Sequence, residues 1–184
     1  IVDRATTIIK KHFEEKGFKN AEVNIKQTDD LTHENEVIVD IYVDKKEKVK
    51  VHKIYIDGNE VLSDRKIKWA MKKTNEKGNL LHLFRTKKFV EENYKNDKNL
   101  IIEKYNELGY RDAAIVNDSV VRYNDKTVDV YLTIDEGKKY YIRNIDWVGN
   151  TIYPSDYLSA VLGMKPGDVY NQKMLNKRTM EDED

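Results

Sequence analysis

The chain has 184 residues, and its 33 basic and 33 acidic side chains give a formal net charge of zero. A protein that binds nucleic acid needs a basic excess to neutralise phosphates, so this balance argues against that class. Cysteine is absent, which excludes disulfides and thiol chemistry, and no apolar run approaches the roughly 20 residues of a membrane-spanning helix.

The first part of the chain contains the pattern of a helix followed by a hairpin. A helical pattern runs from the first residue to Gly17, and Val37, Val39, Ile41 and Val43 then share one face of a strand. No signal peptide precedes the helix, and a helical pattern still runs through the final "TMEDED". We therefore interpret the chain as a fragment of a larger protein.

The middle of the chain begins with a short predicted strand, "HKIYI", in which Ile54 and Ile56 share one face. Gly58 and Asn59 follow, and both residue types tolerate the positive φ angles of a tight turn. Ser63 then suits the N-cap of a first helix. The pattern predicts a strand, a turn and a helix in direct succession.

A second helix and a hairpin complete this middle segment. After a connection from Thr74 to Arg85, apolar spacing predicts a long helix over residues 86–108, and Gly109 suits its left-handed C-terminal cap. Residues 113–121 and 127–134 read as two strands joined by a tight loop. The order strand, helix, helix, strand, strand predicts an α+β fold, in which a three-stranded mixed sheet packs on two helices.

The same pattern occurs more than once along the chain. Gly58-Asn59 recurs as Gly149-Asn150. The early strand recurs at the same spacing, with apolar residues at Val128, Val130, Leu132 and Ile134. The helix end Phe13-x-x-x-Gly17-Phe18 also recurs, as Tyr105-x-x-x-Gly109-Tyr110. We therefore predict the C-terminal part of one repeat in residues 1–47, a complete repeat in 48–136 and the N-terminal part of a third in 137–184.

These motifs resemble the POTRA (polypeptide-transport-associated) repeat. The strand-to-strand junction from Asp135 to Asn150, the helix-to-strand turn "ELGYRDA" and the helix approach "KPGDVYN" carry the resemblance, which covers the whole chain. Tandem copies of this kind resemble the repeats of BamA-type outer-membrane β-barrel assembly proteins. The first junction departs from the pattern, because Lys45-Lys46-Glu47-Lys48 has no glycine where the second junction has Gly137. We expect the two linkers to bend differently, and we interpret the long connection of the middle repeat as a lineage-specific insertion.

The resemblance implies a location and a set of partners. The chain would lie in the periplasm, as the soluble part of a Gram-negative outer-membrane protein, attached to a membrane β-barrel. Its partners would be unfolded outer-membrane proteins and the accessory lipoproteins of the assembly machinery. A structural spacer or docking scaffold is an alternative role, and a relative from two-partner secretion or organelle import is another.

Addition of a client strand to a sheet edge is the expected binding mechanism. The last strand of the repeat has the largest apolar face and should be central, which leaves the strand before it at the edge. Asn117, Asp118 and Ser119 interrupt the alternation of that edge strand, so its pairing register is weakly specified. The predicted client-binding residues are Ala114, Ile115, Val116, Ser119, Val120 and Val121.

No residue pattern indicates an enzyme. The histidines His12, His33, His52 and His82 show no metal-ligand spacing. No nucleotide-binding glycine loop and no Gly-x-x-Gly clamp of a KH module occur in the sequence. We therefore predict no catalytic residue, no metal and no cofactor. We expect Trp147 in the core, whereas Trp69 beside a basic run beginning at Lys66 is either an edge of the core or a surface contact.

Overall fold

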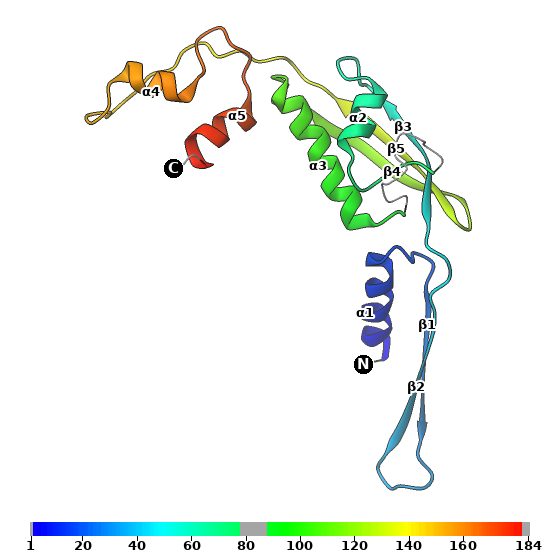
Figure 1. Ribbon diagram of the computed structural model, residues 1–184. Helices are drawn as coiled ribbons and strands as arrows, with labels where there is room; N and C mark the ends of the chain where they lie inside the picture. Colours follow the sequence, from blue (N-terminus) through cyan, green and yellow to red (C-terminus); the bar gives the residue numbers. More distant parts are fainter. Residues whose placement is uncertain (1, 78–87, 182–184) are drawn as a thin grey trace. The chain divides into compact units, whose positions relative to one another are not determined.

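The computed structural model describes residues 2–77 and 88–181 (Figure 1). In chain order the elements are α1 (Val2–Glu15), β1 (Glu22–Asp29), β2 (Val37–Asp44), β3 (Lys50–Asp57), α2 (Asp64–Ala70), α3 (Glu91–Glu107), β4 (Ala114–Asn124), β5 (Thr127–Asp135), α4 (Ser155–Leu162), α5 (Gln172–Asn176) and a π-helical segment (Lys177–Glu181). The predicted α+β class is confirmed. Residues 78–87 lie outside the described residues, and they include most of the predicted connection from Thr74 to Arg85 and the predicted start of the long helix.

Two sheets are present in the described part of the chain. β1 and β2 form an antiparallel pair in which Glu22 lies opposite Asp44 and Asp29 lies opposite Val37. The second sheet has the strand order β3-β5-β4. The prediction that the last strand of the middle repeat is central is therefore confirmed, and β4 is an edge strand.

The central strand β5 carries the core of the middle repeat. Its four predicted core residues, Val128, Val130, Leu132 and Ile134, are at most 5% exposed. These residues alternate along β5 and so lie on one face of the sheet, while the strands on each side pair with its backbone. The core residues of α2 and α3 are buried as well, among them Ile67, Met71, Ile101 and Tyr105.

The local signals at the ends of the helices are largely confirmed. Ser63 precedes α2 in an extended conformation, although its side chain makes no capping hydrogen bond. Gly109 follows α3 with a φ of 93°, the left-handed conformation that glycine permits. The long helix begins at Glu91, later than the apolar spacing predicted.

The chain forms two compact units, and each draws on segments of neighbouring repeats. The first unit comprises Ile1–Tyr55, Lys72–Asp97 and Ser119–Val130. The second comprises Ile56–Met71, Lys98–Asp118 and Tyr131–Asp184. The first unit contains the junction before the middle repeat, and the second contains the junction after it.

Backbone hydrogen bonds hold the first junction on both sides of the linker. The Val49 amide donates to the Gly17 carbonyl (3.0 Å), and the Val49 carbonyl accepts from the Phe89 amide (2.8 Å). Two residues on, the Val51 carbonyl accepts from the Lys77 amide (2.8 Å). The linker is thus bonded both to the helix end of the preceding repeat and to the connection of its own repeat.

The second junction repeats these three bonds. The Tyr140 amide donates to the Gly109 carbonyl (2.9 Å), and the Tyr140 carbonyl accepts from the Tyr170 amide (3.0 Å). The Ile142 carbonyl accepts from the Gly167 amide (2.7 Å). Between the last two donors the middle repeat has residues 78–88, whereas the third repeat has only Asp168 and Val169. The extra length assigned to an insertion therefore falls within residues 78–88.

At the position of the missing glycine the two linkers share one backbone conformation, and the expected difference in bending stays a prediction. Lys46 has a φ of 52°, close to the 64° of Gly137. The Lys46 amide donates to the Asp44 carboxylate (3.0 Å), and the Gly137 amide donates in the same way to Asp135 (3.0 Å). A carboxylate two residues earlier therefore supports the left-handed backbone in both linkers, and lysine adopts it without glycine's freedom.

Candidate functional site

The six predicted client-binding residues all lie on the edge strand β4. Those with exposed side chains are Ala114, Val116, Ser119 and Val121, and those with half-buried side chains are Ile115 and Val120. Ile115 and Val120 are an odd number of positions apart, so they face opposite sides of a regular strand. Neither face of β4 therefore carries a continuous apolar row, as the interrupted alternation predicted.

One ion pair ties the middle of β4 to the long helix. Lys98 Nζ of α3 lies 2.9 Å from Asp118 Oδ2, and both side chains are partly exposed. An exposed pair of this kind contributes at most about 1 kcal/mol to stability. It places the Asp118 side chain on the helix side of the sheet and leaves the backbone edge of the strand unaffected.

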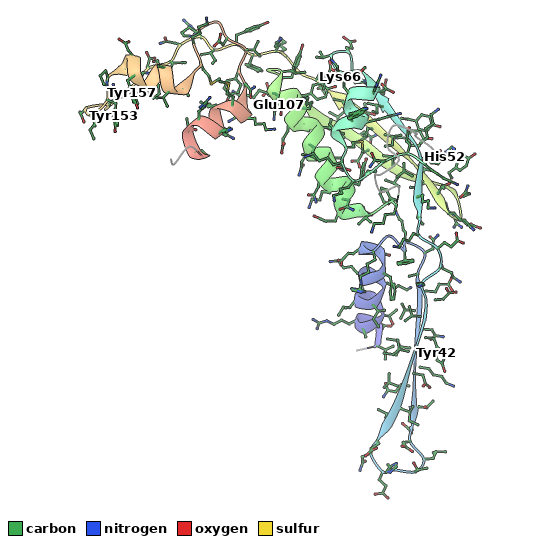
Figure 2. All side chains as sticks on the ribbon, viewed as in Figure 1. Tyr42, His52, Lys66, Glu107, Tyr153 and Tyr157 are labelled. Atoms are coloured by element: carbon green, nitrogen blue, oxygen red, sulfur yellow. The ribbon has the colours of Figure 1, made fainter. Side chains whose placement is uncertain are left out.

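An aromatic stack joins the end of β4 to β3, and the histidine of that stack also contacts the central strand β5. The ring of His52 on β3, which is labelled in Figure 2, lies nearly parallel to the Tyr123 ring at 3.9 Å between centroids. His52 Nδ1 also lies 2.8 Å from Asp129 Oδ1. Asp129 is buried on β5. Sequence reasoning missed this contact, because no local spacing connects His52 with residues on β4 and β5.

A second buried carboxylate organises the segment after α2. The backbone amides of Lys72, Lys73 and Thr74 all donate to the Asp97 carboxylate, at 2.6–3.2 Å. Asp97 is fully buried. Its oxygens accept hydrogen bonds from backbone amides, so its role is structural. Because Lys72 and Lys73 belong to the basic run that begins at Lys66, Asp97 also anchors part of that run.

The two tryptophans have different environments. Trp69 on α2 is exposed, which favours the surface-contact interpretation over the core edge. Trp147 is half-buried, and its Nε1 donates to Ser159 Oγ of α4 at 2.8 Å. The predicted core position of Trp147 is therefore only partly reached in this chain.

One group of possible metal ligands lies in the loop between β1 and β2. Asp30, His33 and Glu36 place one ligand atom each within 4.8 Å of one another, a grouping that the histidine spacing did not reveal. Hydrogen bonds from the hydroxyl and amide of Thr32 lower the pKa of the Asp30 carboxyl. The group is largely exposed, and such acidic groups are common without a metal.

Among the described residues, no helix combines the length and apolar character that crossing a membrane requires.

Comparisons with known proteins agree on one family. The sequence model of the POTRA family, described as "Surface antigen variable number repeat", matches residues 49–137 and 140–181. The Outer membrane protein assembly factor BamA of Neisseria meningitidis serogroup B is 28% identical over 176 residues, which are 95% of this chain and 22% of that protein. The protein of the same name from Buchnera aphidicola subsp. Acyrthosiphon pisum is 24% identical over 180 residues, 94% of this chain and 27% of that protein. The chain therefore spans less than a third of either relative.

A solved structure shares the fold. The crystal structure of Haemophilus influenzae BamA POTRA3-5 has a TM-score of 0.54 and 19% identity, and the match covers 97% of this chain and 66% of that chain. At this identity the likeness shows the fold alone.

Proposed function

Because the chain belongs to the POTRA family and its repeats are of the BamA type, we propose that it is the periplasmic part of an outer-membrane protein assembly factor. In this role it receives unfolded β-barrel proteins and accessory lipoproteins, and a membrane β-barrel anchors it. The family match over most of the chain and the similarity to two BamA proteins support this proposal. The role is one of binding and assembly and includes no catalytic step.

The position of β4 at the edge of the β3-β5-β4 sheet is the observation that carries the proposed mechanism. An edge strand has backbone amides and carbonyls without a strand partner on one side, and an extended client pairs with them through main-chain hydrogen bonds. β4 is 11 residues long, which is enough for such a pairing along most of a barrel strand.

The side chains of β4 suit a receptor for varied clients. Val116 and Val121 are exposed, and the polar residues Asn117, Asp118 and Ser119 lie between them together with the half-buried Val120. With no continuous apolar row on either face, the strand selects weakly by side chain, and the backbone supplies most of the contact. An edge of this kind accepts many extended sequences.

A pair of proline variants tests the mechanism. Successive amides of a strand point to opposite sides, so Ser119→Pro and Val120→Pro remove one outward amide and one that faces β5. The outward variant should stay folded and lose binding of unfolded barrel peptides, together with assembly activity in the full-length protein. The inward variant should destabilise the sheet, which identifies it by its lower melting temperature.

Retained binding in the folded, outward variant would contradict edge addition at β4. The spacer role would then stand, since it needs only the junction hydrogen bonds and no open edge. Chemical shifts of the β4 amides on titration with a client peptide separate the two roles, because a spacer shows no shift.

A further inference from the structure

The second junction is clasped by an ion pair between two helices. Glu107, the last residue of α3, lies 2.8 Å from the ammonium of Lys173, the second residue of α5. Its other oxygen lies 2.6 Å from Lys104. Hydrogen bonds from Lys104 and Lys173 hold the pKa of the Glu107 carboxyl below its ordinary value. The Glu107 carboxylate at the end of α3 thus forms ion pairs with two ammonium groups.

The first junction has the same backbone and different charges. Its corresponding helix end is Glu15, the last residue of α1, and its corresponding second helix residue is Glu92 of α3. The shared junction hydrogen bonds, in which Phe89 is the counterpart of Tyr170, establish this correspondence. A carboxylate therefore stands where the second junction has its lysine, and the counterpart of Lys104 is His12. Within residues 2–77 and 88–181, neither Glu15 nor Glu92 has an ion-pair partner.

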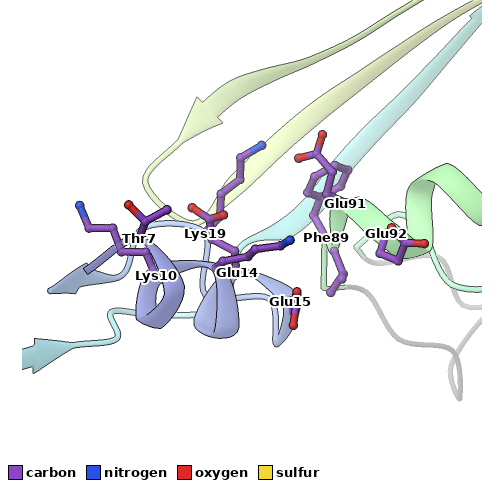
Figure 3. A pocket seen from close by; sticks show the side chains of 10 residues that line it. Thr7, Lys10, Glu14, Glu15, Lys19, Phe89, Glu91 and Glu92 are labelled. Atoms are coloured by element: carbon purple, nitrogen blue, oxygen red, sulfur yellow. The ribbon is translucent and has the colours of Figure 1, made fainter. Parts of the chain in front are cut away.

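A pocket of about 770 Å³ lies between these two helices. Figure 3 shows Glu15 on α1 and Phe89 and Glu92 at the start of α3 on opposite sides of it. Phe89 and Val90 are among its lining residues but are themselves buried, at 2% and 5% exposed, and the Lys19 ammonium lies 4.9 Å from the centre of the Phe89 ring. The remaining lining residues are Thr7, Lys10, Lys11, Glu14 and Glu91.

The two lysines of α1 do not replace the missing clasp. Lys10 and Lys11 precede Glu14 and Glu15 by one helical turn, which is the weaker order for such pairs on an exposed helix. No ion pair joins them to these glutamates in the described part of the chain. Four glutamates and three lysines line the pocket, so its carboxylates outnumber its ammonium groups. Glu15 and Glu92 are the two carboxylates at the positions that Glu107 and Lys173 occupy in the second junction.

We propose that this pocket, the junction pocket, binds a lysine or arginine side chain of a partner polypeptide. The cation takes the place at Glu15 and Glu92 that Lys173 takes at Glu107, and its aliphatic stem lies within the pocket. A bound partner thereby supplies the clasp that the first junction lacks. The junction pocket contains no residue of β4, so cation binding there does not depend on the addition of a client strand to β4.

Titration of the complete 184-residue chain with three capped tripeptides tests the charge preference. The probes are acetyl-Leu-Lys-Leu-amide, its norleucine analogue without the ammonium, and its glutamate analogue. The lysine peptide should shift the amide resonances at the end of α1 and the start of α3 in a saturable way, at least about tenfold more tightly than either analogue. Equal binding of the norleucine peptide, preferred binding of the glutamate peptide, or no shift at these amides would overturn the proposal.

A charge swap tests the location. Glu92→Lys places a lysine where the second junction has Lys173, so it should form the internal clasp with Glu15 and weaken the lysine peptide about tenfold. Glu103→Lys is the matched control, with the same charge change at an exposed position of α3 outside the pocket, and should bind as the parent does. Glu15→Gln gives the same test if Glu92→Lys does not fold. Unchanged binding in a folded Glu92→Lys or Glu15→Gln chain would place the site elsewhere.

Discussion

The stretches Val51–Ser63 and Ile142–Pro154 are two copies of one sequence pattern, and only part of their structure is the same. Both turn glycines have left-handed backbones, with φ of 78° at Gly58 and 79° at Gly149. The next asparagine donates to a carbonyl three residues on in each copy, at 2.7 Å from Asn59 and 3.0 Å from Asn150. The two turns therefore share the glycine conformation and the asparagine–carbonyl hydrogen bond.

The strands before the two turns differ. The first copy contains β3, whereas residues 142–148 form no strand. Leu62 is 2% exposed, and its counterpart Tyr153 is 55% exposed and stacks on Tyr157 (Figure 2). β3 pairs with β5, and no strand among the described residues of the third repeat does the same for residues 142–148. The turn is thus a local property of the sequence, while the strand and its burial depend on a distant partner.

Replacing the turn glycine in each copy should give the largest difference. An alanine Cβ at Gly58 would lie 2.1 Å from the Ile134 backbone oxygen, whereas one at Gly149 would meet nothing within 4 Å. We expect Gly58→Ala to lower the free energy of unfolding by about 3 kcal/mol, from clash and left-handed strain together. Gly149→Ala should cost about 1 kcal/mol, from strain alone.

Urea unfolding followed by tryptophan fluorescence measures both effects. Trp69 reports the middle repeat in a Trp147→Phe background, and Trp147 reports the third repeat in a Trp69→Phe background. Equal losses in the two copies would show that the partner strand does not distinguish them.

The carboxylate of Glu136 provides the next largest test. It accepts from the Tyr105 hydroxyl (2.9 Å) and from the Val61 amide (2.9 Å), so it holds the turn of the middle copy to α3. Glu136→Ala should destabilise the middle repeat by about 2 kcal/mol, because two donors lose their acceptor. The Trp69 signal should move while the Trp147 signal stays, and Lys138→Ala on the exposed linker serves as the control.

The same hydrogen bond predicts a loss of stability at high pH. Burial, and then the hydrogen bond to Glu136, raise the pKa of Tyr105 above its ordinary value of about 10. A raised folded pKa means that the contribution is complete below about pH 10 and is lost as pH rises through the folded value. The urea midpoint should therefore fall above pH 10, and Tyr105→Phe should fall less steeply. Parallel pH profiles would exclude Tyr105 as the source.

The smallest expected change in the free energy of unfolding comes from a substitution in the first linker. Lys46 and Gly137 share one left-handed conformation, which strains lysine by roughly 1 kcal/mol relative to glycine. Lys46→Gly also loses ion pairs to Asp44 and Glu22, which are exposed and contribute little. We expect a gain of at most about 1 kcal/mol in the unfolding free energy of the first junction. A clear loss would show that the ion pairs outweigh the strain.

Features set by neighbouring residues were predictable from the sequence. The alternation of β5, the glycine after α3 and the repeated turns follow from local periodicity and backbone preference, and the structure has each of them. The edge position of β4 was also predictable, because the apolar face of β5 left it only one place in the sheet.

Features that depend on distant residues were not predictable. His52 meets Tyr123 and Asp129 only because three strands pair. The left-handed backbone of Lys46 was not predictable from its residue type, and it matches Gly137 with the same hydrogen bond to an aspartate two residues earlier. The change from the Glu107–Lys173 pair of the second junction to two glutamates, Glu15 and Glu92, in the first became visible only when the junction hydrogen bonds established which residues correspond.

Hydrogen exchange along β4 tests the central claim most directly. The amides of Ala114–Asn124 are measured in the complete chain with and without a ten-residue peptide of alternating apolar and polar residues, the pattern of a barrel strand. Edge addition predicts that the alternate, outward amides of β4 become protected, while the amides of β5 keep the protection they already have. Unchanged exchange along β4, or new protection confined to another edge such as β1, would contradict the account.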